Sequence, residues 1–314
     1  MSVTTKRPSR TRGPIRPALA AALAALVLGA GRADAEFLIG VTTTNNLVTF
    51  DSATPGTLSG SVGLTGLQAG ETLLGIDFRP ASGGLYGLGS TSRLYAINPT
   101  TGAAIQVGSA GAFTLSGTAF GFDFNPTVDR IRVVSNTGQN LRLNPNDGTL
   151  TATDTILAYA TGDPNAGATP RVVGSAYTNN FSGATTTTLY GIDSNLDILV
   201  AQGSPGGSPV SPNTGQLFTV GALGFNTSDL VGFDVSGVSG IAFAAMTAPA
   251  GNFSQLFTVN LATGAATLVG TIGGGVPLVG LAAAAPAIPE PSTLVLLAIG
   301  SLGTLAYRRR SRRA

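Results

Sequence analysis

The sequence predicts an all-β fold, a β-propeller of about five four-stranded blades whose last blade is completed by N-terminal strands. Three observations support this prediction. A string of one type recurs along the middle of the chain, each repeat contains four short strand-like runs, and the last repeat stops after its first run.

The first 35 residues are typical of a secretory signal peptide. A basic segment precedes an apolar run at 18–28, and Ala33-Asp34-Ala35 forms a cleavage box of small residues. The leader contains no Arg-Arg pair, which favours general secretion over the twin-arginine route. We therefore expect signal peptidase to cut before Glu36, leaving a mature domain at 36–287.

Five similar strings mark the innermost strand of each expected blade. Their glycines follow one another at intervals of 46, 53, 58 and 48 residues, at Gly75, Gly121, Gly174, Gly232 and Gly280. Turns ending in glycine recur between them, as at 98–102 and 144–148, where proline fixes φ and glycine accepts a positive φ. A two-sheet sandwich does not predict such a repeat, and the coils of a β-helix have shorter periods.

The strand-like runs give the order of elements within one blade. In the first complete unit they lie at 75–80, 84–89, 92–99 and 103–108, separated by Gly, Pro, Ser and Asn. The string at 278–283 has no further strand after it, whereas 37–42, 45–51 and 57–64 supply three. We expect these segments to share one blade. A six-bladed ring is the alternative, because the longer intervals hold extra residues at 159–172 and 201–215.

The last segment, 288–314, has three parts in a fixed order. They are Pro289-Glu290-Pro291, an apolar stretch at 293–307, and an arginine-rich end that includes Arg308, Arg309 and Arg310. The stretch is shorter than the ~20 residues that span a bilayer comfortably, and the arginines favour a cytoplasmic C-terminus.

This order resembles the PEP-CTERM sorting signal of Gram-negative bacteria. The resemblance implies that the tail resides transiently in the inner membrane. It also implies that an exosortase recognises the tail, removes it and releases the protein toward the cell surface or an exopolysaccharide matrix. A plain tail anchor is the alternative. The stretch from Phe122 to Leu150, FDFNPTVDRIRVVSNTGQNLRLNPNDGTL, in turn resembles a family of exported bacterial domains of unknown function, which implies fold and export but no chemistry.

Composition excludes several classes of function. Residues 36–287 contain six arginines, no lysine and 13 acidic residues, a net charge of −7, so we expect no nucleic-acid partner. The chain has no His and no Cys, which removes Ser-His-Asp and Cys-His nucleophiles, ordinary zinc sites and iron–sulfur ligation. We expect no cofactor. Our favoured interpretation includes no metal site and a protein that is not an enzyme.

One candidate site consists of three aspartates at the same position of the inner strands, Asp77, Asp123 and Asp234. Alanine occupies this position at Ala176 and Ala282. Inner strands line the channel of a propeller, so the carboxylates are expected to converge. They are candidate catalytic groups of a glycoside hydrolase, or ligands of calcium. The structural alternative, hydrogen bonding to backbone amides in turns, is favoured by the two alanines.

A second candidate site is a group of polar residues that could bind an acidic ligand: Arg130, Arg132, Arg142, Gln139 and Asn140. Two guanidinium groups on one face of a strand suit a carboxylate, as on a uronic-acid polysaccharide. The alternative is that the arginines form ion pairs with Asp129, Asp147 or Asp154.

Taken with the export signals, these residues favour a structural or polysaccharide-binding protein of the cell surface or matrix. A glycoside hydrolase that uses Asp77, Asp123 and Asp234, and a calcium-stabilised adhesion module, are the alternatives.

Overall fold

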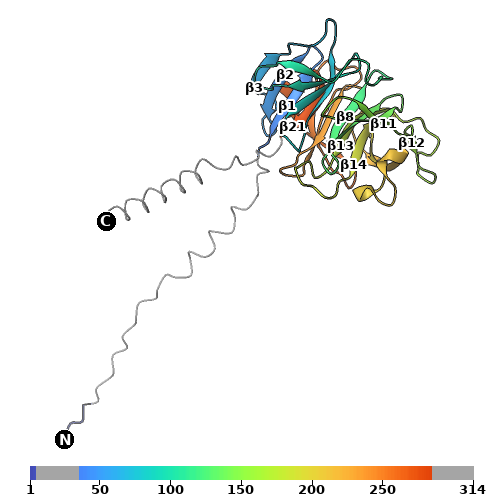
Figure 1. Ribbon diagram of the computed structural model, residues 1–314. Coiled ribbons are helices and arrows are strands. Elements are labelled where there is room, and N and C mark those ends of the chain that lie inside the picture. The colour runs from blue at the N-terminus through green and yellow to red at the C-terminus, as the bar shows by residue number, and fades with distance from the viewer. Residues whose placement is uncertain (5–34, 285–314) are drawn as a thin grey trace, which may run out of the picture. The chain divides into compact units, whose positions relative to one another are not determined.

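The structure is a computed structural model that describes residues 1–4 and 35–284. Residues 36–284 form five antiparallel sheets arranged as the blades of a β-propeller (Figure 1). The expected count of five is thus confirmed. The apolar run of the expected signal peptide and the whole segment 288–314, with its expected membrane helix at 293–307, lie outside the described residues. Within the described part of the chain, no helix has the length and apolar character needed to cross a bilayer.

Three blades follow the simple order in which each strand pairs with the next, from the channel outward. The first contains β4 (Leu73–Phe78), β5 (Leu85–Gly89), β6 (Arg93–Ile97) and β7 (Ala104–Val107). The second contains β8 (Phe120–Asn125), β9 (Arg130–Ser135), β10 (Asn140–Leu143) and β11 (Leu150–Thr153). The fourth contains β17 (Val231–Val235), β18 (Ala242–Met246), β19 (Gln255–Val259) and β20 (Ala266–Thr271).

The third blade carries an insertion. Its regular strands are β13 (Val172–Tyr177), β14 (Leu189–Asp193), β15 (Ile198–Gln202) and β16 (Gln216–Ala222). The short strand β12 (Ala158–Tyr159) pairs with the outer edge of β16 in parallel. Two 3-10 turns, Pro205–Gly207 and Pro212–Thr214, lie between β15 and β16. The extra residues that suggested a sixth blade therefore enlarge one blade instead.

The fifth blade closes the ring with strands from both ends of the domain. Its order is β21 (Leu278–Ala283), β1 (Phe37–Thr42), β2 (Asn46–Asp51) and β3 (Leu58–Gly63). In Figure 1 the red β21 lies beside the blue β1, and the two pair in antiparallel register from Leu38 opposite Ala283. This confirms the predicted sharing of one blade.

Burial changes from the centre of the propeller to its rim. All six residues of β13 are buried, whereas β3 at the rim of its blade alternates between half-buried and exposed residues. A strand covered on both faces favours a continuous apolar run, and a strand with one face in water favours alternation. The described core consists of five apolar clusters, each between two neighbouring blades.

The repeated glycines of the inner strands lie where neighbouring blades approach one another closely. A Cβ atom at Gly121 would lie 2.6 Å from Cβ of Ser175 on the next inner strand, and one at Gly280 would lie 3.0 Å from Cα of Gly75. Any side chain here would therefore push two backbones apart. Beside these glycines the structure has a cavity of about 10 Å³, roughly the room that one water molecule needs.

Candidate functional site

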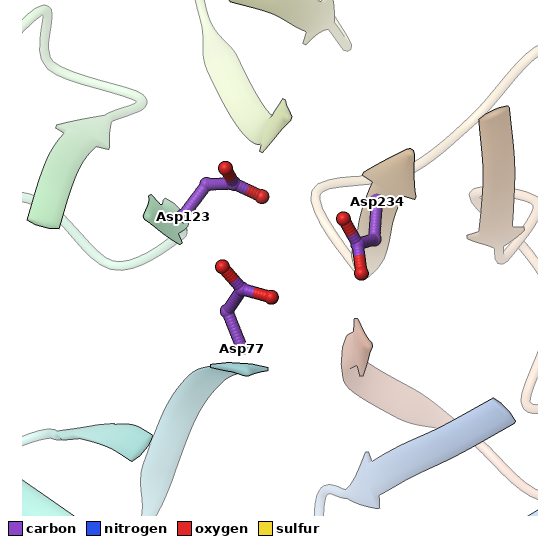
Figure 2. Close-up of side chains that lie close together, drawn as sticks. All are labelled: Asp77, Asp123 and Asp234. Carbon is purple, nitrogen blue, oxygen red and sulfur yellow. The ribbon is translucent and has the colours of Figure 1, made fainter. Parts of the chain in front are cut away.

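The three aligned aspartates come together at the ends of their inner strands. Asp77, Asp123 and Asp234 have carboxylate oxygens that all lie within 4.8 Å of one another, and Figure 2 shows the three groups facing a common space. Each residue is at most 1% exposed. We call these three residues the axial cluster. The predicted convergence is therefore present in the structure, at a place closed to solvent.

Each carboxylate of the axial cluster also joins two blades. Each accepts a hydrogen bond from a backbone amide on the inner strand of the following blade. The pairs are Phe124 to Asp77 at 2.8 Å, Tyr177 to Asp123 at 3.0 Å, and Ala283 to Asp234 at 2.7 Å. The aspartates thus act structurally as acceptors for backbone amides, and these three hydrogen bonds cross from one blade to the next.

The two alanines in the aligned column do not interrupt this pattern. The backbone amides that would face them, of Phe78 and Val235, each donate a hydrogen bond to the aspartate just before them, at 2.6 Å in both cases. Three carboxylates therefore serve five aligned amides, one on each inner strand. The sixth carboxylate oxygen, Asp123 Oδ2, is buried and has no hydrogen-bond partner among the described residues.

Burial dominates the electrostatics of the axial cluster. Removal from water raises the pKa of all three carboxyls above the ordinary value, because a low-dielectric interior disfavours the charged form. The charge of Asp234 raises the pKa of Asp77 further, and the charges of Asp77 and Asp234 do the same for Asp123. The amide hydrogen bonds lower the pKa only in part. The cluster thus strongly favours any group that neutralises negative charge.

The predicted binding arginines meet at a different place, in a cavity between the second and third blades. Arg130, Arg132 and Arg142 all line this cavity, which has a volume of about 490 Å³. We call it the arginine pocket. No carboxylate lines it among the described residues. Hydroxyl groups supply much of the remaining wall, from Thr127, Thr151, Tyr177, Thr185, Thr186, Thr187, Ser204 and Ser211.

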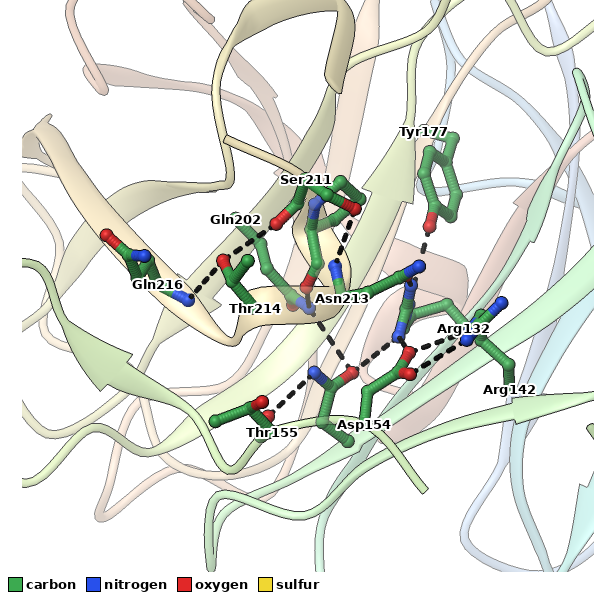
Figure 3. A network of polar contacts seen from close by, with 12 residues as sticks. Arg132, Arg142, Asp154, Thr155, Tyr177, Gln202, Ser211, Asn213, Thr214 and Gln216 are labelled. Carbon is green, nitrogen blue, oxygen red and sulfur yellow. Dashed lines mark hydrogen bonds and ion pairs between the residues drawn. The ribbon is translucent and has the colours of Figure 1, made fainter. Parts of the chain in front are cut away.

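Arg132 is the buried floor of the pocket. Its side chain is 2% exposed and donates to Asp154 Oδ2 at 2.6 Å, Asn140 Oδ1 at 2.7 Å and Asn213 Oδ1 at 2.6 Å (Figure 3). Tyr177 Oη accepts a longer bond from its Nε, at 3.4 Å. The backbone amide of Tyr177 donates to Asp123, and its Oη accepts from Arg132, so Tyr177 contacts both the axial cluster and the pocket. Asp123 and Arg132 lie opposite each other in the β8–β9 pairing.

The other two arginines are more available to a ligand. Arg142 is 28% exposed and makes a bidentate contact with Asp154, from Nε at 2.8 Å and from a terminal nitrogen at 2.9 Å. Arg130 donates to the backbone carbonyl of Asp129 at 2.8 Å and forms no ion pair within the described residues. One carboxylate is therefore shared by two of the three guanidinium groups, which leaves the pocket positive.

The remaining predicted residues have supporting positions. Asn140 is buried beneath Arg132, and its Nδ2 donates to the carbonyl of Thr155 at 2.9 Å. Gln139 does not line the pocket but braces a loop, since it accepts from the Ser116 amide and donates to the Thr114 carbonyl. In the described part of the chain, Arg132 and Arg142 form the expected ion pairs with Asp154. Asp129 pairs with Arg79 instead, and Asp147 forms no ion pair there.

Sequence reasoning missed the part of the pocket contributed by the third-blade insertion. Residues 204–213 form one wall and bring Asn213 onto Arg132. The signal was visible as an extra length of Gly, Ser and Pro, but no local pattern says against which blade such a loop packs.

Comparisons with known proteins give a family and a sorting motif. The family described as Domain of unknown function (DUF4394) matches residues 46–282, and the PEP-CTERM protein-sorting motif matches residues 287–310. No curated protein matches the chain.

Two solved structures are similar at low identity. One is a dihydro-heme d1 dehydrogenase, NirN, in complex with DHE, at 13% identity and a TM-score of 0.38, covering 74% of this chain and 43% of that one. The other is a protein from Lactobacillus plantarum, at 16% identity and a TM-score of 0.38, covering 76% of this chain and 67% of that one. This chain thus spans less than half the length of the first of them.

Proposed function

Because the chain belongs to the DUF4394 family and ends in a PEP-CTERM protein-sorting motif, we propose that it is an exported, exosortase-processed protein whose propeller binds an acidic polysaccharide. The motif indicates export with a sorting tail in a Gram-negative cell, and recognition of that tail by an exosortase. Release to the cell surface or the extracellular matrix, and the ligand, are parts of the proposal.

The arginine pocket is the observation that carries the binding proposal. Three guanidinium groups and a wall of hydroxyls line it, in a domain whose net charge of −7 makes such a concentration of positive charge unusual. Guanidinium groups bind carboxylates with two parallel hydrogen bonds, and hydroxyls match those of a sugar. A volume of about 490 Å³ is within the range of small-molecule sites.

Burial of the axial cluster favours binding over hydrolysis. A glycosidase needs two carboxyl groups in contact with the scissile bond and, in both common mechanisms, water at the sugar. Asp77, Asp123 and Asp234 are 1%, 0% and 1% exposed, so a polysaccharide cannot touch them in this conformation. We therefore propose a protein that holds its ligand without cleaving it.

The test is binding of the full chain to polygalacturonate, with neutral dextran as the comparison. We expect binding only to the polyuronate, with an affinity that falls as salt rises. Arg130→Gln should weaken it about tenfold, because a charge-assisted hydrogen bond contributes about 1.5–3 kcal/mol and Arg130 has little role in the fold.

Arg171→Gln is the matched control, since Arg171 pairs with Asp229 and does not line the pocket. Isothermal titration calorimetry measures the affinity of the wild type, Arg130→Gln and Arg171→Gln for the polyuronate. Equal affinity of the wild type and Arg130→Gln, or no wild-type binding to the polyuronate, would remove this function.

A further inference from the structure

Asp123 and two residues that act on the axial cluster each have a buried side-chain oxygen without a hydrogen-bond partner. These oxygens are Asp123 Oδ2, Asn180 Oδ1 and Glu36 Oε1, and they make up three of the five buried side-chain polar atoms that lack a partner in the described part of the chain. Each belongs to a residue at most 8% exposed. A buried acceptor without a donor is costly, so Asp123 Oδ2, within a cluster of three carboxylates, indicates a missing positive or donating group there.

Asn180 lies directly at the axial cluster. It follows β13 in the chain, and its backbone carbonyl packs against Gly237 just beyond β17, where a Cβ atom would lie 2.0 Å from the carbonyl oxygen. Burial raises the pKa of Asp77 and of Asp234, and hydrogen bonding by the Asn180 amide lowers both in part. One side-chain amide thus faces two of the three carboxylates.

In the uncleaved chain, Glu36 brings a fourth carboxyl group toward the axial cluster. It lies just before β1, where its backbone amide donates to Ser52 Oγ at 2.9 Å, and its charge acts on Asp234. Among the described residues, no arginine forms an ion pair with the cluster or with Glu36. Several buried carboxylates without a cation are strongly unfavourable unless protons or a metal ion neutralise them.

The donor set matches a hard cation. From these contacts we propose that Asp77, Asp123 and Asp234, together with Asn180, hold one divalent cation of the calcium class at this end of the channel. Carboxylate and amide oxygens are the ligands that calcium takes from proteins. An ion equidistant from three oxygens up to 4.8 Å apart would lie within about 2.8 Å of each, close to calcium–oxygen distances of about 2.3–2.6 Å.

The interblade hydrogen bonds are compatible with such an ion. A carboxylate oxygen has two acceptor sites, so one that receives a backbone amide keeps a second for a cation. Asp123 Oδ2 is free altogether. Rotation of the Asn180 amide by half a turn exchanges its nitrogen for Oδ1 and makes it a fourth ligand, with water completing the coordination. A single buried water would donate only two hydrogen bonds and carry no charge.

The experiment is a calcium titration of the full chain after treatment with EDTA. Native mass spectrometry should show one calcium ion per chain. The Tm should rise by about 5 °C once calcium exceeds its Kd about 100-fold, because the ion binds only the folded state. Magnesium, which needs shorter distances and near-ideal octahedral geometry, should bind more weakly.

Asp123→Asn separates the ion site from the fold. Its Oδ1 can still accept the Tyr177 amide, while one buried negative charge is lost, so its Tm in EDTA should equal or exceed that of the wild type. Its calcium-dependent rise in Tm should disappear. Asp147→Asn is the control, because Asp147 is exposed in a turn of the second blade and should leave the calcium response intact.

Asn180→Ala provides an independent variant should Asp123→Asn fail to fold. It removes an amide with an unpartnered oxygen and should weaken calcium binding about tenfold. The proposal is overturned if calcium neither binds nor shifts the Tm of the wild type. It is equally overturned if the folded variants bind calcium as the wild type does.

Discussion

Asp154 controls the charge of the arginine pocket. Its side chain is 6% exposed and accepts hydrogen bonds from both Arg132 and Arg142. A buried guanidinium group without a carboxylate is costly, so this residue makes it possible to bury Arg132 at the floor of the pocket. Arg130, which lacks such a partner, is the arginine whose charge remains for a ligand.

The first prediction concerns this residue. Asp154→Asn should lower the free energy of unfolding by about 3 kcal/mol at pH 7, because Arg132 loses its buried partner. Burial raises the pKa of Asp154, but the hydrogen bonds from Arg142 and Arg132 outweigh it and hold the pKa below its ordinary value. A carboxyl with a depressed folded pKa stabilises above its unfolded pKa of about 3.9 and loses that contribution as pH falls through the folded value.

Urea unfolding of the wild type and Asp154→Asn between pH 7 and pH 2 measures the effect. The difference between the two proteins should be constant above about pH 5 and shrink below about pH 4. Asp147→Asn, in an exposed turn, is the control and should differ little from the wild type. A difference for Asp154→Asn that persists unchanged at pH 2 would show that Asp154 does not act through its charge.

At the scale of single elements, the inner strands are specialised for close approach. Gly121 in β8 faces Ser175 in β13, and the backbones come so near that a Cβ at Gly121 would lie 2.8 Å from the Ser175 nitrogen. Two residues further along the same two strands, the backbone amide of Tyr177 donates a hydrogen bond to Asp123. Glycine and aspartate thus serve one purpose at neighbouring positions, which is to fasten one inner strand to the next.

The second prediction is that Gly121→Ala lowers the free energy of unfolding by about 2 kcal/mol, because the added methyl group meets backbone that cannot move independently. Gly63→Ala in the outer strand β3 is the matched control. There the nearest atom, Asn46 Oδ1, lies 3.6 Å from the added Cβ, an ordinary contact. Urea unfolding of both variants checks the prediction, and equal stability of the two would contradict it.

At the scale of the whole molecule, the ring depends on its last strand. β21 pairs with β1 and lies between the inner strands β17 and β4, and Asp234 binds the Ala283 amide. The sorting motif begins at residue 287, only a few residues beyond the end of β21 at Ala283. Removal of the tail at the Pro-Glu-Pro sequence would therefore leave the closure of the propeller intact.

The third prediction compares two truncations of the mature domain. A chain of residues 36–287 should unfold in one cooperative transition, whereas residues 36–277 should lose most of their stability, because the fifth blade then lacks its inner strand. Differential scanning calorimetry measures the thermal unfolding transition of both truncated chains. The protein recovered from its own cells, examined by intact mass, should end beyond Ala283. A stable, cooperative 36–277 fragment would contradict this account of closure.

The sequence predicted the fold well because a propeller repeats one local unit. Each strand-and-turn signal occurs several times, so a weak signal becomes strong, and the leftover strands at the two ends identified the shared blade. The three aligned aspartates were likewise found as a column of the repeat. Gln139 was grouped with the pocket by its position in the chain, but its side chain braces a separate loop.

By itself, the sequence determined the sorting motif, the repeated four-stranded unit, the blade shared by the two ends and the identity of the charged residues, because these depend on local pattern and composition. The tertiary structure decided between five blades and six, since it places the extra residues in the third blade. Only the tertiary structure decided that the axial cluster is buried and joins blades. It also decided that Asn180 and Glu36 approach the cluster, and that the 204–213 loop forms a wall of the arginine pocket. The physical reason is that loop positions and burial depend on contacts between blades far apart in the chain, and no period in the sequence records them.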